Sequence, residues 1–209
     1  MKNLMVSMVA AFALLLTQMA VAESYISGKD YHQVAYPVPV RDESKIEVIE
    51  LFWYGCGHCY KFEPMVNQWM KTIPEDVEFH HQPGDFGGWV PETQLHYTME
   101  ILDVLDKGRA AAFNEYHVMR NKLRSDSKRI AFFKTLGVSE ADYTKAWNSF
   151  SVKSKVNMAQ SRTRSYKVTC VPALIVNGKY RVDSRSAGSF DRMLQVVDYL
   201  VDLERTAKK

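Results

Sequence analysis

The segment KIEVIELFWYGCGHCY, residues 45–60, places an apolar, β-rich run directly before two closely spaced cysteines. Residues 45–54 are rich in β-branched and aromatic side chains, which favours a buried strand. From residue 57 to about 73 the apolar residues recur near helical spacing, with Pro64 expected to kink the helix because proline cannot donate the i to i−4 hydrogen bond. The segment therefore predicts a strand, a turn that carries the cysteines, and a helix.

The two cysteines, Cys56 and Cys59, stand on the first turn of this expected helix. A C-x-x-C pair can close a disulfide within one turn, and its first sulfur faces unpaired N–H groups and the positive end of the helix dipole. Both effects lower the pKa of Cys56 and make it the nucleophile and the leaving group. His58 can act in the same direction, as a cation or as an N–H donor. Cys59, one turn inward, is the expected resolving thiol.

Two other interpretations of the C-x-x-C are half a zinc site and a pair of inert core cysteines. A zinc knuckle needs a second ligand pair at similar spacing, and neither Cys170 nor the adjacent His80-His81 supplies one. A C-x-x-C beside a βαβ pattern indicates redox chemistry instead, and an odd count of three cysteines does not suit a purely structural disulfide framework. We therefore expect no metal site.

The remaining elements are a second strand, a helical block, a hairpin and a final helix. The second strand is expected over residues 77–81 and completes the βαβ unit. The helical block is expected to contain helices over 93–105, 110–122, 127–136 and from 140 onward, with junctions at Gly108, at 124–126 and at Gly137. Strands return at 173–176 and 180–182 around Asn177-Gly178, the signal for a two-residue hairpin turn, and the final amphipathic helix covers 190–203.

Residues 1–22 have the pattern of a secretory signal peptide. Lys2 precedes an apolar run over 4–16, and Ala20-Val21-Ala22 forms an A-x-A cleavage site. A transmembrane anchor is the alternative, but polar residues interrupt the run, which falls short of the about 20 residues needed to span a bilayer. We expect cleavage after Ala22 and a soluble mature protein beyond the inner membrane, where disulfides can form and persist.

The composition limits the remaining classes of function. The chain has 209 residues, of which 46% are hydrophobic and 24% charged, so it can bury a core and is neither disordered nor an integral membrane protein by composition. The formal net charge is only +3 and the basic residues are spread along the chain. We expect no binding to nucleic acid.

Taken together, these residues resemble the bacterial periplasmic thiol-disulfide oxidase family, DsbA. The matching positions are the strand 48–52, the motif Cys56-Gly57-His58-Cys59-Tyr60, Phe62-Glu63, the segment AWNSF at 146–150, Val171-Pro172-Ala173 and the segment VNGKY at 176–180. The resemblance implies an α/β, thioredoxin-like fold with an inserted helical domain. Residues 23–84 and 165–209 would form the thioredoxin-like domain, and residues 85–164 the inserted helical domain.

The resemblance also implies roles for residues outside the redox turn. Glu50 matches an acidic residue beneath the active site that can pass protons to or from the buried cysteine; a partly solvated strand glutamate is the alternative. A lysine is often found near that residue, and here His80 or His81 replaces it. Val171-Pro172 matches the loop that faces the redox pair, with a cis peptide bond before Pro172, where an extended substrate pairs with the backbone. An ordinary trans proline at the start of a strand is the alternative.

The function implied is a periplasmic thiol:disulfide oxidase that donates the Cys56–Cys59 disulfide to unfolded secreted proteins. It would need no cofactor besides that disulfide, and a membrane quinone-linked partner of the DsbB type would reoxidise it. Gly57 stands where the best-known members carry proline, so a disulfide isomerase or reductase of the same compartment is an alternative. A non-catalytic periplasmic chaperone is the alternative from a different class.

Two further expectations concern assembly and the third cysteine. Known isomerases of this compartment resemble V-shaped dimers with a separate dimerisation domain, for which too few residues precede the first core strand. We therefore expect a monomer. Cys170, two residues before Pro172, is expected to be a packed, unreactive thiol rather than a redox group.

Overall fold

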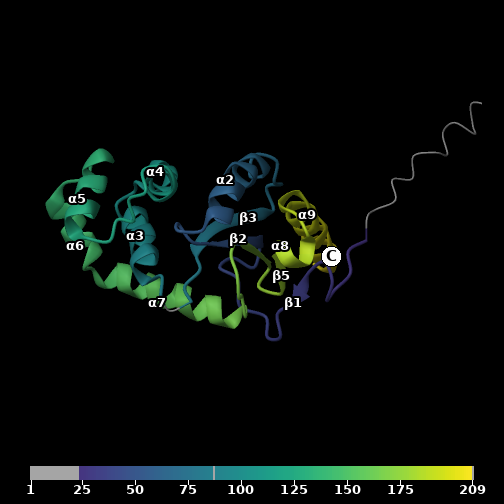
Figure 1. The fold of residues 1–209 in the computed structure, drawn as a ribbon. Coiled ribbons are helices and arrows are strands. Elements are labelled where there is room, and N and C mark those ends of the chain that lie inside the picture. Colours follow the sequence, from purple (N-terminus) through teal and green to yellow (C-terminus); the bar gives the residue numbers. More distant parts are fainter. Residues whose placement is uncertain (1–23, 87, 209) are drawn as a thin grey trace, which may run out of the picture.

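The computed structural model describes residues 24–86 and 88–208, and the expected signal peptide over residues 1–22 lies outside them. A five-stranded sheet forms the centre of the described part (Figure 1). Its strands follow the order β1 (His32–Gln33), β5 (Tyr180–Asp183), β4 (Ala173–Val176), β2 (Ile46–Phe52) and β3 (Val77–Pro83). β2 and β3 are parallel and α2 (Gly57–Trp69) joins them, whereas the other neighbours are antiparallel. The predicted βαβ unit is confirmed.

Helices cover the sheet and extend beyond it on one side. α8 (Ser184–Ala187) and α9 (Phe190–Ala207) follow β5. Between β3 and β4 the chain forms α3 (Val90–Ile101), α4 (Leu105–His117), α5 (Asp126–Thr135), α6 (Glu140–Trp147) and α7 (Phe150–Ser165). Figure 1 shows α3 to α6 grouped beside the sheet, with the long α7 running beneath them and back to it. The chain is thus a thioredoxin-like sheet with a block of helices inserted in it, as predicted.

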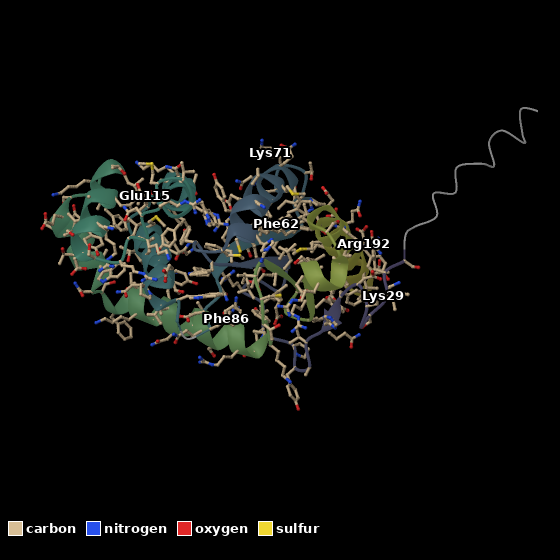
Figure 2. The ribbon with its side chains drawn as sticks, in the orientation of Figure 1. Lys29, Phe62, Lys71, Phe86, Glu115 and Arg192 are labelled. Atoms are coloured by element: carbon tan, nitrogen blue, oxygen red, sulfur yellow. The ribbon has the colours of Figure 1, made fainter. Side chains whose placement is uncertain are left out.

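β2 is buried along its whole length because both faces of the sheet are covered. Ile46 and Val48 pack against α2 and α9, and Phe62 of α2 points toward α9 (Figure 2). Ile49 and Leu51 pack on the opposite face. β2 ends where the sheet meets the helical block, so the redox turn that follows it lies at the junction of the two parts.

The boundary between α3 and α4 differs from the prediction. Gly108 is expected to be a junction, but it lies inside α4, and the chain turns instead at Asp103, whose φ is +54°. A Cβ on Gly108 would lie 2.6 Å from Sδ of Met99, which belongs to α3. Gly108 therefore allows two helices to approach closely and does not end one. The helices predicted over 93–105 and 110–122 are consequently too far toward the C-terminus.

Other elements also differ from the prediction. α2 ends at Trp69, a few residues before the expected end. The helix expected from residue 140 is divided in two, because the Ser149 side chain caps α7 by accepting a hydrogen bond from the Val152 N–H. β1 and α8 are too short to show a hydrophobic period and are not predicted.

The hairpin between β4 and β5 has a three-residue connection rather than the predicted two. Asn177 and Gly178 have φ values of +50° and +65°, the conformation that Asn-Gly turns favour, and Lys179 is the third residue. A Cβ on Gly178 would lie 2.0 Å from the carbonyl oxygen of Val38, so the N-terminal segment also requires glycine here. Among the described residues, no helix has both the length and the hydropathy needed to cross a membrane.

Candidate active site

Cys56 is the residue that caps the N-terminus of α2. Its Sγ accepts a hydrogen bond from the backbone N–H of Cys59, with 3.4 Å between sulfur and nitrogen. Hydrogen bonding to the Cys59 thiol lowers the pKa of Cys56 to about 6, with help from the N–H groups of Cys59 and His58 and the charge of His58, against its partial burial. The Cys59 thiol and the N–H groups at the start of α2 thus together make Cys56 acidic, the direction that the sequence predicts.

Cys59 lies one turn further along α2 and is fully buried. Burial raises the pKa of the Cys59 thiol far above its usual value, and the neighbouring Cys56 and Glu50 act in the same direction. The structure holds both cysteines as free thiols. In this dithiol form the proton belongs to the inner sulfur and the negative charge to the outer one.

The two residues between the cysteines are both exposed. Nothing lies within 4 Å of the position that a Cβ on Gly57 would take, so no close approach demands glycine there. The ring of His58 lies edge-on to Phe190 of α9, with 6.3 Å between the ring centres. In the described structure His58 acts on Cys56 through its charge and its backbone N–H.

Val171 and Pro172 lie directly opposite Cys56. Their peptide bond is cis, which confirms the expectation from the resemblance. Cys56 Sγ lies 3.5 Å from the carbonyl oxygen of Val171, and it can donate a hydrogen bond to that oxygen only when the thiol is protonated. Val171 is half-buried, whereas Pro172 is buried. A carbonyl group from a distant part of the chain is thus fixed beside the nucleophile.

A network of charges lies beneath the redox turn and is centred on Glu50. This carboxylate is fully buried in β2 and accepts hydrogen bonds from His81 Nδ1 at 2.6 Å and from Arg109 Nη2 at 2.9 Å. Burial alone would raise the pKa of Glu50, but the charge of Arg109 and the hydrogen bond from His81 outweigh it and hold the pKa below its usual value. The histidine that faces Glu50 is therefore His81, whereas His80 lies 3.3 Å from Glu78.

Arg109 joins the network from α4, in the helical block. Its guanidinium also donates to both carboxylate oxygens of Glu63 on α2, at 2.8 and 2.5 Å, and it lies over the ring of Phe52, 3.9 Å from its centre. The sequence prediction missed Arg109. One signal could have found it: a glutamate inside an apolar strand needs a cationic partner, and Arg109 stands in the small-residue segment GRAAA at 108–112.

Cys170 is half-buried, two residues before Pro172. Burial raises the pKa of the Cys170 thiol, and the charge of Asp183 adds to the effect. A raised pKa opposes thiolate formation, which agrees with an unreactive thiol. Among the residues that the structure describes, no group of three or more His, Cys, Asp or Glu side chains has the arrangement of a metal site.

Comparisons with known proteins agree with this geometry. A family model described as a DSBA-like thioredoxin domain matches residues 93–200. The thiol:disulfide interchange protein DsbA of Pseudomonas syringae pv. tomato is 43% identical over 211 residues, covering 100% of this chain and 99% of that protein. The DsbA of Pseudomonas aeruginosa is 40% identical over 210 residues, all of both chains. A crystal structure of P. aeruginosa DsbA covers 88% of this chain and 97% of its own, with a TM-score of 0.84 and 41% identity. The chain therefore belongs to the DsbA family of thiol:disulfide interchange proteins.

Proposed function

We propose that Cys56 and Cys59 carry out the thiol:disulfide exchange of this family in the oxidising direction, in the periplasm. The observation that supports this most strongly is the contrast between Cys56, whose pKa is lowered, and Cys59, whose pKa is raised, within one helical turn. Hydrogen bonds from the Cys59 thiol and from the N–H groups at the start of α2 stabilise the Cys56 thiolate, which favours the reduced form over the disulfide. A protein with that preference passes its disulfide to other proteins, and protein thiols are the substrates of this family.

The exchange has two steps. A substrate thiolate attacks Sγ of Cys56 in the oxidised protein, the Cys56–Cys59 bond breaks, and Cys59 leaves and takes up a proton. A second substrate thiolate then attacks the substrate sulfur of the mixed disulfide, the substrate disulfide forms, and Cys56 leaves as a thiolate. Two electrons pass from the substrate to the protein. Because the pKa of Cys56 is about 6, its thiolate is a good leaving group at neutral pH.

Glu50 is the group that we assign to the proton of Cys59. The lowered pKa of Glu50 keeps the carboxylate ionised at neutral pH, so it can accept the Cys59 proton when Cys59 must attack during reoxidation. His81 lies between Glu50 and the surface, with 16% of its side chain exposed, and offers the proton a path to solvent. Arg109 is a positioning residue that acts through Glu50 and touches neither sulfur.

The Val171 carbonyl is the proposed docking point for the substrate backbone. It lies 3.5 Å from Cys56 Sγ, close enough to accept an N–H from an extended segment whose cysteine reacts there. Backbone pairing needs little particular sequence, which suits a protein that must oxidise many partners. We further propose that the Cys56–Cys59 pair is the sole redox group, that a membrane quinone-linked protein of the DsbB type reoxidises it, and that the protein is a monomer.

An equimolar reaction between the oxidised protein and a reduced two-cysteine peptide tests this function. We expect the peptide to lose two thiols and the protein to gain two, with the peptide almost fully oxidised at equilibrium. Titration against glutathione places the pair on a redox scale. If the protein's disulfide is instead more stable than an ordinary peptide disulfide, the pair acts as a reductase and the oxidising direction is wrong.

A further inference from the structure

A cavity of about 250 Å³ lies beside the redox turn, between the residues that precede Cys56 and the end of α4. Trp53 and Gly55 form part of its wall. Gly55 immediately precedes Cys56, so their Cα atoms are about 3.8 Å apart and the cavity begins next to the nucleophile. The segment after α4 adds three cationic side chains to the wall: Arg120, Lys122 and Arg124.

Positive charge predominates in this cavity. All three cationic side chains are exposed, and none forms an ion pair with an acidic side chain of residues 24–86 or 88–208. Glu92 also lines the cavity, but its carboxylate already accepts a hydrogen bond from the hydroxyl group of Tyr116, at 3.2 Å. Three cations therefore face one engaged carboxylate, and the cavity attracts anions.

Trp53 supplies an independent feature that also favours an oxygen ligand. Its indole Nε1 is buried and donates to no protein group in the described structure. The indole stacks on Trp89, with 4.4 Å between ring centres, and lies over Gly55, where an added Cβ would meet Cε2, the atom bonded to Nε1, at 2.7 Å. A buried N–H without an acceptor costs free energy. Trp53 also lines the cavity, so a small rotation of the indole would let an oxygen atom bound there accept this N–H.

The segment that carries the cations is held in a defined conformation. Glu115 of α4, seen in Figure 2, accepts a hydrogen bond from Asn121 Nδ2 at 2.7 Å. Arg129 of α5 donates through Nη1 to the carbonyl oxygens of Leu123 and Arg124, at 3.0 and 2.9 Å. These bonds fix the backbone between α4 and α5, so the cations stand beside the cavity before any ligand arrives.

We propose that this cavity binds a carboxylate of the substrate, supplied by an Asp or Glu side chain close in sequence to the reacting cysteine. Guanidinium groups and an indole N–H are suitable donors to a carboxylate. An extended peptide advances about 3.3 Å per residue, so an acidic residue two or three positions from the cysteine can reach the cavity. The inference rests on the proposed exchange at Cys56 and adds a preference for acidic sequence around the substrate cysteine.

The test compares two reduced peptides that differ only in carrying Glu or Gln two and three residues from the cysteine. Both are acetylated and amidated, so that the side chain is their sole source of carboxylate. Stopped-flow tryptophan fluorescence measures the rate constant for reduction of the oxidised protein by each peptide. We expect the Glu peptide to react about fivefold faster at low salt, since each exposed ion pair contributes only modestly. The advantage should shrink above about 0.1 M salt, where the Debye length is about 10 Å.

Two variants and a matched control separate the cavity from general charge. The triple variant Arg120→Gln/Lys122→Gln/Arg124→Gln should bring the ratio of the Glu-peptide rate to the Gln-peptide rate close to one. The variant Trp53→Phe keeps an aromatic ring but lacks the N–H, and it should lower this ratio. The control Lys29→Gln/Lys71→Gln/Lys153→Gln removes equal charge from exposed sites elsewhere and should keep the ratio; Figure 2 shows Lys29 and Lys71 away from α4.

Each contrary outcome has a distinct meaning. Equal rates for both peptides with the unaltered protein would overturn the carboxylate site while the disulfide exchange stands. If the control variant lowers the ratio of the two rates as much as the cavity variant does, the net charge of the protein causes the preference, and the carboxylate site is also overturned. If neither peptide is oxidised, the proposed function fails, and the inference fails with it.

Discussion

Cys56 caps α2 and Cys59 lies in its first turn, but their surroundings change their acidities in opposite directions. Cys56 is half-exposed, and hydrogen bonds from the Cys59 thiol and from backbone N–H groups lower its pKa to about 6. Cys59 is fully buried beside Glu50, and burial raises its pKa far above the usual value. The difference teaches that a C-x-x-C motif does not itself set thiol acidity. The groups around each sulfur set the acidity of its thiol, and in this chain the helical block provides many of the groups around Cys59.

The largest expected effect comes from replacing each of the two cysteines by serine, one at a time. Cys56→Ser removes the nucleophile and should abolish disulfide transfer. Cys59→Ser keeps the acidic Cys56 and should attack substrate disulfides, but it lacks the thiol that resolves the mixed species, which should accumulate. Non-reducing gels after incubation with a disulfide substrate show both outcomes. Slow alkylation of Cys56 in the Cys59→Ser variant at pH 6 would show that the two roles are wrongly assigned.

Replacing Arg109 tests the buried surroundings of Cys59, in which Arg109 is the partner of Glu50. Arg109→Met leaves Glu50 and Glu63 buried without their shared cation, and such a change typically costs about 3–5 kcal/mol in the free energy of unfolding. Urea unfolding at pH 7 measures the loss. The matched control is Arg162→Met, because Arg162 lies 3.6 Å from buried Glu47, which keeps Arg41 at 3.1 Å. A cost for Arg109→Met no larger than for this control would contradict the role given to Arg109.

The lowered pKa of Cys56, the outer sulfur, predicts a difference in the free energy of unfolding between the reduced and the oxidised protein. A thiolate with a lowered pKa stabilises the reduced fold fully above the unfolded pKa of about 8.5, and this contribution disappears as the pH falls through about 6. After allowance for solvent screening, it is worth about 1 kcal/mol at pH 7 and nothing at pH 4. The small disulfide loop restrains the unfolded chain little compared with longer loops.

Urea unfolding of both forms measures this difference. The reduced protein should be the more stable form at pH 7, and its advantage should shrink at pH 4. Greater stability of the oxidised form at pH 7 would favour the isomerase or reductase alternative.

The smallest effect is expected at the third cysteine. Cys170→Ser should keep most of the activity in a peptide oxidation assay, because the exchange needs only one thiolate and one resolving thiol, and burial raises the pKa of Cys170. Loss of more than about tenfold would show that Cys170 takes part in the exchange.

The redox turn could be predicted from the sequence, whereas the groups packed around and beneath it could be predicted only in part. Cys56, His58 and Cys59 are adjacent in the chain, and their arrangement follows from the strand and helix that flank them. Glu50 and the loop at Pro172 came from the resemblance. Arg109 could not be located because it is 59 residues from Glu50 in sequence, and their contact depends on how α4 packs on α2.

The same distinction explains the errors in the fold. The buried strands and α9 have strong local patterns, so their type was predictable. Gly108 was misinterpreted because a glycine that permits helix contact and a glycine that ends a helix look alike in sequence. β1 is only two residues long and depends on pairing with β5, which no local pattern records.

Titration of the reduced protein tests the contrast between the two sulfurs most directly. In the Cys170→Ser variant, which keeps both Cys56 and Cys59, ultraviolet absorbance reports thiolate formation as the pH rises. We expect one thiolate to form with a midpoint near pH 6, and no second one to form in the range where ordinary thiols ionise, about pH 8.5. Two thiolates that both form near pH 8.5 would contradict the account, because helix and burial would then leave the two sulfurs alike.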